Sequence, residues 1–256
     1  MSWERNIIIK SKDEIAIMRE AGRINARALA TVRELIHPGV ATIELDAAAE
    51  EVIRKHGAIP TFKGVPGAYP YPATLTVSVN DELVHGIPSQ RQLKEGDIVS
   101  VDCGTTYKGF VGDSAFSMGV GEVSPAAQDL LEVTERSLYI GIEHLRTGNR
   151  VGDVGHAIEQ FVEGKGYHLT RQYTGHGVGR AMWEGPQVPN YGIRGRGIPL
   201  RSGMVIALEP MVLVGTPETR VLADQWTVSS ADGSLTAHFE HTVAVTEDGP
   251  QILTLP

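Results

Sequence analysis

Hydrophobic residues at intervals of three and four predict two long helices, over residues 12–36 and 125–145. The apolar positions of the first helix are Ile15, Met18, Ile24, Leu29, Val32, Leu35 and Ile36. Those of the second helix are Leu130, Leu131, Val133, Leu138 and Leu145. Residues at this spacing lie on one face of a helix, so each helix is expected to bury one face against the rest of the chain.

Two segments that follow the long helices, residues 39–58 and 148–167, align without a gap, and each is predicted to hold a turn, a shorter helix and a glycine stop. Gly39 matches Gly148 in the turn, and Gly57 matches Gly166 at the position where a glycine commonly stops a helix. Chance can produce one such match, because helices resemble one another. Two helices and their connecting turn at a single offset favour a duplicated half-domain.

Runs of residues typical of strands follow each pair of predicted helices. They cover residues 74–80, 98–104 and 109–118 in the first half, and 204–214, 225–230 and 237–246 in the second. No linker, low-complexity tract or long charged run separates the halves. We therefore expect one α+β domain over residues 1–256, with pseudo-symmetric halves at about 12–120 and 121–256 around a curved antiparallel sheet.

Two acidic residues interrupt the apolar strand pattern of the first half. A turn at Lys108–Gly109 would pair Asp102 with Ala115, and Asp113 would then lie two positions along on the same face. Carboxylates so close repel each other. Either one or both of them point to solvent, or a cation lies between them, supplied by a Lys or Arg side chain or by a metal ion.

The second half repeats this pattern at Glu209 and Glu240, which lie in the apolar runs VIALEPMV and FEHTVAV. An ionised carboxylate is costly to bury unless it is paired or coordinated. His176 lies between two glycines in YTGHGVG, which leaves its imidazole accessible, although a lone histidine of this kind is more often structural. Four carboxylates and one imidazole favour Mn, Fe, Co or Zn, and five ligands suit two ions that activate a water for hydrolysis.

Composition narrows the classes of function. The net charge of −8 does not favour a DNA or RNA partner, and no apolar run approaches the roughly 20 residues that span a bilayer. The only cysteine, Cys103, excludes an internal disulfide and suits a reducing compartment. The N-terminal residues lack the apolar segment of a signal peptide, so a cytoplasmic location is expected.

Five stretches together resemble the type I methionine aminopeptidases, which have the pita-bread fold. They are NDELVHGIP (80–88), VDCGTTYKGFVGDSAF (101–116), YTGHGVG (173–179), MVIALEPMV (204–212) and FEHTVAV (239–245), and they follow the order and spacing of that family. The resemblance implies that two divalent metal ions are bound by Asp102, Asp113, His176, Glu209 and Glu240. It also implies that Glu209 acts as the general base and that His85 contacts the substrate backbone and assists catalysis.

The same resemblance implies a closed apolar pocket for an N-terminal methionine side chain. Tyr71, Thr76 and Trp226 fall at its positions, although Trp226 could instead belong to the core. Met182 and Trp183 stand where relatives carry an aromatic residue and a histidine that hydrogen-bonds the scissile peptide, and Ala68 replaces a tyrosine at the pocket entrance. Substrate contacts are therefore expected to be altered, while the metal ligands are complete.

The implied activity is metal-dependent removal of the initiator methionine from nascent polypeptides and peptides with a small second residue. Two alternatives remain because of Trp183: a shifted preference for the N-terminal residue, or a weakly active peptide-binding relative. A proline-dipeptide peptidase of the same fold is the nearest enzymatic rival. A monomer is expected, and Arg194, Arg196 and Arg201 could contact the ribosome or could be solvated loop charges.

Overall fold

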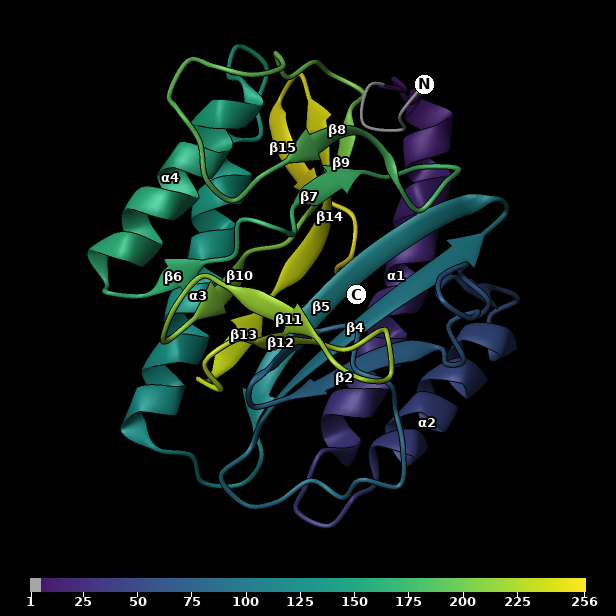
Figure 1. The fold of residues 1–256 in the computed structure, drawn as a ribbon. Helices are drawn as coiled ribbons and strands as arrows, with labels where there is room; N and C mark the ends of the chain where they lie inside the picture. Colours follow the sequence, from purple (N-terminus) through teal and green to yellow (C-terminus); the bar gives the residue numbers. More distant parts are fainter. Residues whose placement is uncertain (1–5) are drawn as a thin grey trace.

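The structure is a computed structural model that describes residues 6–256, so the first residues used to predict the cellular location lie outside it. Within this range the helices are α1 (Lys12–Leu35), α2 (Thr42–Lys55), α3 (Pro125–His144) and α4 (Val151–Gly164). Figure 1 shows α1 and α2 on one flank of the molecule and α3 and α4 on the other, with the strands between them. None of the helices in residues 6–256 is long and apolar enough to cross a membrane.

The strands of the described residues form one large and two small antiparallel sheets. The strands of the first half are β1 (Ile59–Pro60), β2 (Leu75–Val79), β3 (Glu82–Val84), β4 (Ile98–Tyr107) and β5 (Phe110–Gly119). The next are β6 (His168–Leu169), β7 (Gly175–Gly177), β8 (Glu184–Val188), β9 (Val205–Leu208) and β10 (Met211–Leu213). The last are β11 (Thr219–Val221), β12 (Val228–Ser230), β13 (Thr236–His238), β14 (Glu240–Thr246) and β15 (Gly249–Ile252).

The large sheet has the order β1-β4-β5-β14-β9-β7-β8, with β2 paired to β4 and β15 paired to β14. The two small sheets have the orders β13-β10-β6 and β11-β12-β3. The single curved sheet expected from the sequence is therefore accompanied by two smaller sheets in front of it, as Figure 1 shows.

Matching elements recur in the two parts of the chain. Helix α2 and helix α4 begin and end at one constant offset, and the two-residue strands β1 and β6 follow them at that same offset. Strand β1 pairs with β4, and β6 pairs with β10. These spacings support the proposed division into two related halves.

Local hydrogen bonds define where the long helices begin. The Ser11 side chain accepts from the Glu14 backbone N–H, and the Glu14 carboxylate accepts from the Ser11 backbone N–H, which is the reciprocal pattern of a capping box. Helix α3 begins with Ser124 as the cap and Pro125 in the first turn, where a missing N–H carries no cost. The predicted long helices are confirmed to within one residue at each end.

Helix α1 packs directly on the hairpin of β4 and β5. A Cβ atom added to Gly112 of β5 would lie 2.6 Å from the backbone nitrogen of Gly22 in α1, so glycine at position 112 permits the close approach of helix and sheet. A Cβ atom added to Gly22 would instead meet the backbone carbonyl of Leu253. The side chain of Asn25 is fully buried beside this contact. Its amide donates to the carbonyls of Cys103 and Gly112, which ties the helix to both strands.

Two predicted strands are each divided in the structure. Residues 204–214 form β9 and β10, separated by Glu209 and Pro210, and residues 237–246 form β13 and β14, separated by Phe239. Strands β9 and β14 pair in the large sheet, whereas β10 and β13 pair in a small one. Proline cannot donate to a ladder, so the paired strands bend from one sheet into the other at this point.

The predicted strand over residues 225–230 is shorter than expected, because only Val228–Ser230 form β12. The backbone of Gln225 has a φ of 65°, which is a turn conformation. Asp224 accepts from the backbone N–H groups of Trp226 and Thr227, and this local turn replaces the first half of the strand.

The helix–sheet contact leads to a prediction about stability. Gly112→Ala places a methyl group against the α1 backbone and should lower the free energy of unfolding by about 1–3 kcal/mol. Gly164→Ala is the matched control, because its added Cβ meets nothing within 4 Å and should raise stability by about 0.5–1 kcal/mol. Urea denaturation followed by circular dichroism measures both, and equal stability of the two variants would contradict the close packing.

Candidate metal centre

The five predicted metal ligands come from five neighbouring strands of the large sheet. Asp102 lies in β4, Asp113 in β5, Glu240 at the start of β14, Glu209 directly after β9, and His176 in β7. These strands are adjacent in the order β4-β5-β14-β9-β7. Residues distant in the chain are therefore brought side by side at one level of the sheet.

The register places the acidic side chains on one face. Ala115 pairs with Asp102 on one side and with Glu240 on the other, and Asp113 lies two residues before Ala115 in the same strand. Paired residues and residues two apart share a face of an antiparallel sheet. The predicted pairing of Asp102 with Ala115 is confirmed.

Distances show that four of the five side chains lie close together. The Nε2 atom of His176 lies 4.0 Å from Oδ2 of Asp113 and 3.5 Å from Oε1 of Glu209. Ligand atoms of Asp113, His176 and Glu240 all lie within 4.8 Å of one another. Glu209 lies between β9 and β10 rather than within the strand predicted for it, because the strand bends there.

The carboxyl groups of this cluster are held in an environment that disfavours their charge. Burial raises the pKa of Asp102 to about 7. Burial also raises the pKa values of Asp113, Glu209 and Glu240 well above their usual range, and neighbouring carboxylates raise them further. A bound cation would reverse this penalty by stabilising the ionised forms.

The cluster has unsatisfied oxygen atoms and no basic partner. Oδ1 of Asp102, Oδ1 of Asp113 and Oε1 of Glu240 are buried without a hydrogen-bond partner among residues 6–256. No Lys or Arg of the described chain forms an ion pair with any of the four carboxylates. Of the two cations considered from the sequence, a metal ion therefore fits the donor set and a basic side chain does not.

His176 is oriented by its own backbone neighbourhood. Its Nδ1 atom lies 2.9 Å from the carbonyl oxygen of Gly177, so an Nδ1–H tautomer donates there and directs Nε2 toward the carboxylates. Burial lowers the pKa of His176 to about 4, which keeps the imidazole neutral. A neutral imidazole is the form that binds a metal ion.

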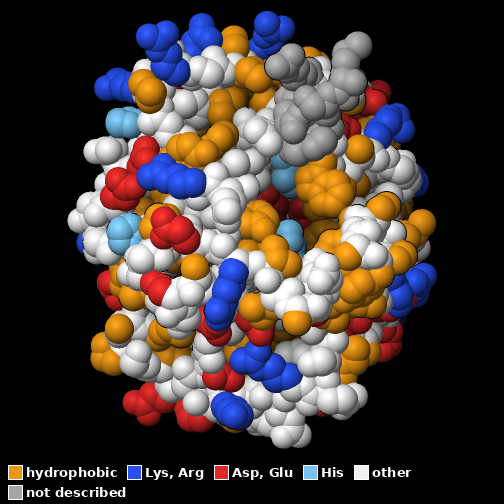
Figure 2. Space-filling view, in the orientation of Figure 1, with side chains coloured by type: hydrophobic (Ala, Val, Ile, Leu, Met, Phe, Trp, Pro, Cys, Tyr) orange, Lys and Arg blue, Asp and Glu red, His pale blue; other side chains and the backbone are white. Residues whose placement is uncertain are grey.

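A cavity of about 230 Å³ opens above the carboxylates. All the predicted substrate-binding residues line it, namely Tyr71, Thr76, His85, Met182, Trp183 and Trp226. Figure 2 shows the hollow, with Asp and Glu side chains at its base and hydrophobic side chains around it. The cavity also includes Phe62, Val65, Tyr173 and Gln187, for which the sequence pattern offered no signal.

One side of the cavity is apolar and aromatic. Tyr71 and Trp226 meet edge to face with ring centroids 5.1 Å apart, and Met182 packs with Tyr71 and Phe62 in the same hydrophobic cluster. Trp226 is therefore a partly buried residue that packs against this cluster and forms a wall of the cavity. Ala68 is exposed and lies outside the cavity lining, so it does not narrow the entrance.

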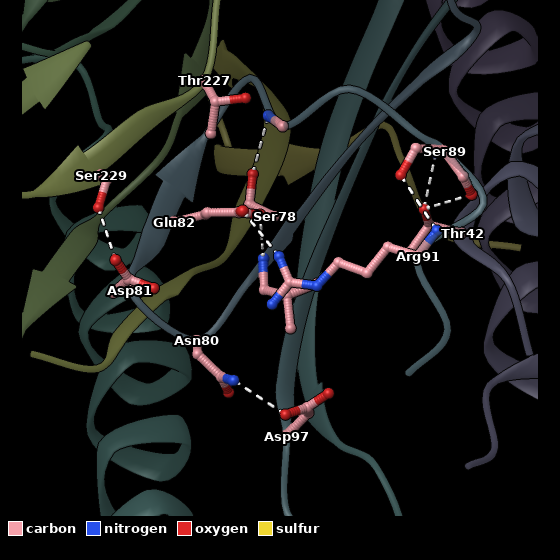
Figure 3. Close-up of polar contacts among 12 residues, drawn as sticks. Thr42, Ser78, Asn80, Asp81, Glu82, Ser89, Arg91, Asp97, Thr227 and Ser229 are labelled. Carbon is pink, nitrogen blue, oxygen red and sulfur yellow. Dashed lines mark hydrogen bonds and ion pairs between the residues drawn. The ribbon is translucent and has the colours of Figure 1, made fainter. Parts of the chain in front are cut away.

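His85 follows the β2–β3 hairpin in a constrained backbone conformation with a φ of 62°. Gly86 holds this turn: its N–H donates to Oγ of Ser78, and its carbonyl accepts from the Tyr71 hydroxyl at 2.9 Å. Figure 3 shows the polar network around this hairpin, including Asn80 with Asp97. Burial lowers the pKa of His85 to about 4, so its imidazole is neutral.

Trp183 lies at the mouth of the cavity, with 43% of its surface exposed. Its ring meets His176 edge to face, with centroids 6.5 Å apart. The next residue, Glu184, is buried and pairs with Lys10 at 2.5 Å, while its other oxygen accepts from the Arg180 and Ala181 N–H groups. The loop that presents Met182 and Trp183 is thereby fixed.

His238 is a site residue that the sequence analysis did not select. It is 2% exposed, and its Nε2 atom lies 3.9 Å from Oε2 of Glu209. Burial, together with the electrostatic influence of the nearby His85, lowers the pKa of His238 to about 3. The available signal was its position two residues before Glu240, which places both side chains on one face.

Comparison with known proteins identifies the family. Residues 16–247 match the metallopeptidase family M24. A methionine aminopeptidase of Clostridium perfringens is 48% identical over 249 residues, which cover 97% of this chain and 99% of that protein. The chain belongs to metallopeptidase family M24. The resemblance to type I methionine aminopeptidases predicted from the sequence is confirmed.

Solved M24 structures show the same fold. The crystal structure of methionine aminopeptidase from Thermotoga maritima has a TM-score of 0.95 and 45% identity, covering 98% of this chain and 100% of that chain. Prolidase from Pyrococcus furiosus has a TM-score of 0.79 at 24% identity, covering 97% of this chain and 66% of that chain, and shows the fold alone. The predicted pita-bread fold is confirmed. Membership of M24 and the buried Asp, His and Glu group together indicate divalent metal binding.

Carboxylate repulsion in this M24 site leads to a second prediction. With metal removed by EDTA at pH 7, the free energy of unfolding of Asp113→Asn should exceed that of the wild type by on the order of 1 kcal/mol, because one buried acid is neutralised. Added Mn²⁺ should stabilise the wild type much more than this variant.

Chemical denaturation with EDTA and with Mn²⁺ measures both effects. Asp224→Asn is the control, because Asp224 lies outside the carboxylate cluster and accepts hydrogen bonds from Trp226 and Thr227. It should lose stability under both conditions. An Asp113→Asn protein that is less stable than the wild type in EDTA would show that repulsion does not dominate the cluster.

Proposed function

We propose that this M24 protein is a metal-dependent aminopeptidase that removes the N-terminal methionine from nascent proteins and peptides with a small second residue. The observation that carries the proposal is that all five proposed metal ligands line one cavity that has an apolar wall, and that three of them form a compact Asp, His and Glu group. A methionine side chain fits such a wall, because its thioether packs well against aromatic edges. The relatives with near-complete coverage are methionine aminopeptidases.

The proposed metal ligands are Asp102, Asp113, His176, Glu209 and Glu240, and the proposed cofactors are two ions of Mn, Fe, Co or Zn. When bound, such ions polarise a peptide carbonyl and lower the pKa of a water molecule. The number of donor atoms supports two ions, because four carboxylates and one imidazole exceed what a single tetrahedral ion requires. The buried oxygens without partners support the same conclusion.

The proposed general base is Glu209. Its carboxylate borders both the ligand group and the cavity, so it can take a proton from the water that attacks the scissile carbonyl. His85 lines the cavity as a neutral imidazole and can hydrogen-bond the peptide backbone of the substrate. The turn at Gly86 holds His85 in place, which favours a reproducible substrate orientation.

The proposed side-chain pocket consists of Tyr71, Thr76, Met182 and Trp226. Thr76 pairs with Asp102 in the β2–β4 ladder, so the pocket begins directly beside a proposed metal ligand. Its other walls are the apolar cluster around Phe62.

The cellular location and the partners of the protein stay predictions. The expectations of a cytoplasmic location and a monomeric state rest on the sequence alone. The three arginines considered for ribosome contact are exposed, and none of them lines the cavity.

The main test is release of the first residue from X-Ala-Ser peptides after metal removal and addition of Mn²⁺, Fe²⁺, Co²⁺ or Zn²⁺. We expect metal-dependent cleavage only when X is methionine, and none with Asp113→Asn. Cleavage of another first residue would instead support the shifted preference. Absence of cleavage with every metal would support a peptide-binding relative.

Substitution of Trp183 provides a sharper test of whether the substrate contacts at the cavity mouth are altered. An indole N–H can donate but cannot accept a hydrogen bond, whereas the histidine of relatives can do either. Trp183→His should therefore raise kcat/KM for Met-Ala-Ser by about threefold to tenfold, the value of one hydrogen bond. Trp183→Phe is the control, because it keeps an aromatic ring without a polar atom, and its kcat/KM should not rise. A lower kcat/KM in Trp183→His would mean that the indole itself binds substrate.

A further inference from the structure

The side chain of His238 has an unsatisfied nitrogen directed at the centre. Nε2 is buried and has no hydrogen-bond partner among residues 6–256. Its only carboxylate within 4.0 Å in the described chain is that of Glu209, through Oε2 at 3.9 Å. A buried polar atom without a partner is costly, so its retention here requires an explanation.

The backbone of His238 is rigidly placed. Its N–H donates to Oγ of Ser117 at 2.9 Å, and its carbonyl accepts from the same hydroxyl at 2.7 Å. It also pairs with Met211 in the β10–β13 ladder. The imidazole therefore projects from a fixed point beside the bend that carries Glu209.

The two oxygens of Glu209 face different partners. Oε1 lies 3.5 Å from Nε2 of His176, on the side of the proposed metal ligands, whereas Oε2 faces His238. The Glu209 backbone is held independently, because its carbonyl accepts from Asn190 at 2.9 Å. His238 thus lies on the outer side of this carboxylate, and it is not part of the Asp113, His176 and Glu240 group.

We propose that His238 is a positioning residue whose Nε2–H donates to Oε2 of Glu209 and directs Oε1 toward the metal ligands. The proposal rests on the proposed function of Glu209 as ligand and base. The separation of 3.9 Å exceeds a hydrogen bond, which spans about 2.7–3.2 Å, so the proposal requires the Glu209 carboxylate to move toward His238 by about 1 Å. Hydrogen bonds of this kind to ligating carboxylates commonly set ligand orientation.

The test compares His238→Leu and His238→Gln with His241→Gln as the matched control. A glutamine amide keeps a donor for Oε2, whereas leucine removes it. His241 is also a mostly buried histidine, but it bonds Thr254 and lines a different cavity on the other side of β14. Measurements are kcat and KM on Met-Ala-Ser, and Co²⁺ affinity with the visible spectrum of the Co²⁺ protein.

We expect His238→Leu to lower kcat by about 10-fold to 100-fold, to leave KM within about threefold, and to weaken Co²⁺ binding about tenfold with a changed spectrum. His238→Gln should keep kcat and the Co²⁺ affinity within about threefold of the wild type, and His241→Gln should resemble the wild type in both. If His238→Leu does not fold, His238→Met supplies a second apolar side chain of similar length.

Two results would overturn the proposal. In one, His238→Leu keeps wild-type kcat and Co²⁺ affinity. In the other, His238→Gln melts like the wild type but is as impaired as His238→Leu, which would mean that the imidazole itself is required. If the wild-type protein releases no N-terminal residue, the proposed function fails, and the Co²⁺ affinities and spectra still decide the role of His238.

Discussion

Repulsion among four buried carboxyl groups is the constraint on which the rest of this structure depends. Burial raises the pKa of each group, and neighbouring carboxylates of the cluster further raise the pKa values of Asp113, Glu209 and Glu240. No basic side chain of residues 6–256 neutralises them. Folding must therefore hold together carboxyl groups that, without a cation, repel one another or become protonated. A divalent cation bound between them replaces this repulsion with attraction. Stability and metal binding are consequently coupled in this M24 protein.

Two features of the scaffold hold the cluster in place. Helix α1 lies so close to β5 that Gly112 has no room for a side chain, and Asn25 ties the helix to the carbonyls of β4 and β5. On the opposite side, the paired strands bend from the large sheet into a small one at Pro210, which brings Glu209 to the cavity. The acidic residues are thus placed by main-chain contacts, which are insensitive to the charge of the cluster itself.

The carboxylate cluster follows the family pattern, whereas the residues around the cavity depart from it. The five proposed ligands match the pattern of the family, whereas Met182 and Trp183 depart from it at the cavity wall and mouth. His238 acts from outside the carboxylates, through one oxygen of Glu209. In the proposed function, metal binding and substrate selection therefore depend on different side chains, so substrate selection can change while the metal ligands are retained.

The sequence alone determined the long helices, the face shared by Asp102 and Asp113, and the set of candidate ligands, because these depend on local periodicity and on the cost of burying charge. It did not reveal the bend at Glu209, the two small sheets or the orientation of His238. Those features depend on which strands pair across the whole chain, and periodicity within one strand carries no information about its partners. Only the tertiary structure placed the five proposed ligands on, or directly after, five adjacent strands and directed a histidine at one oxygen of Glu209.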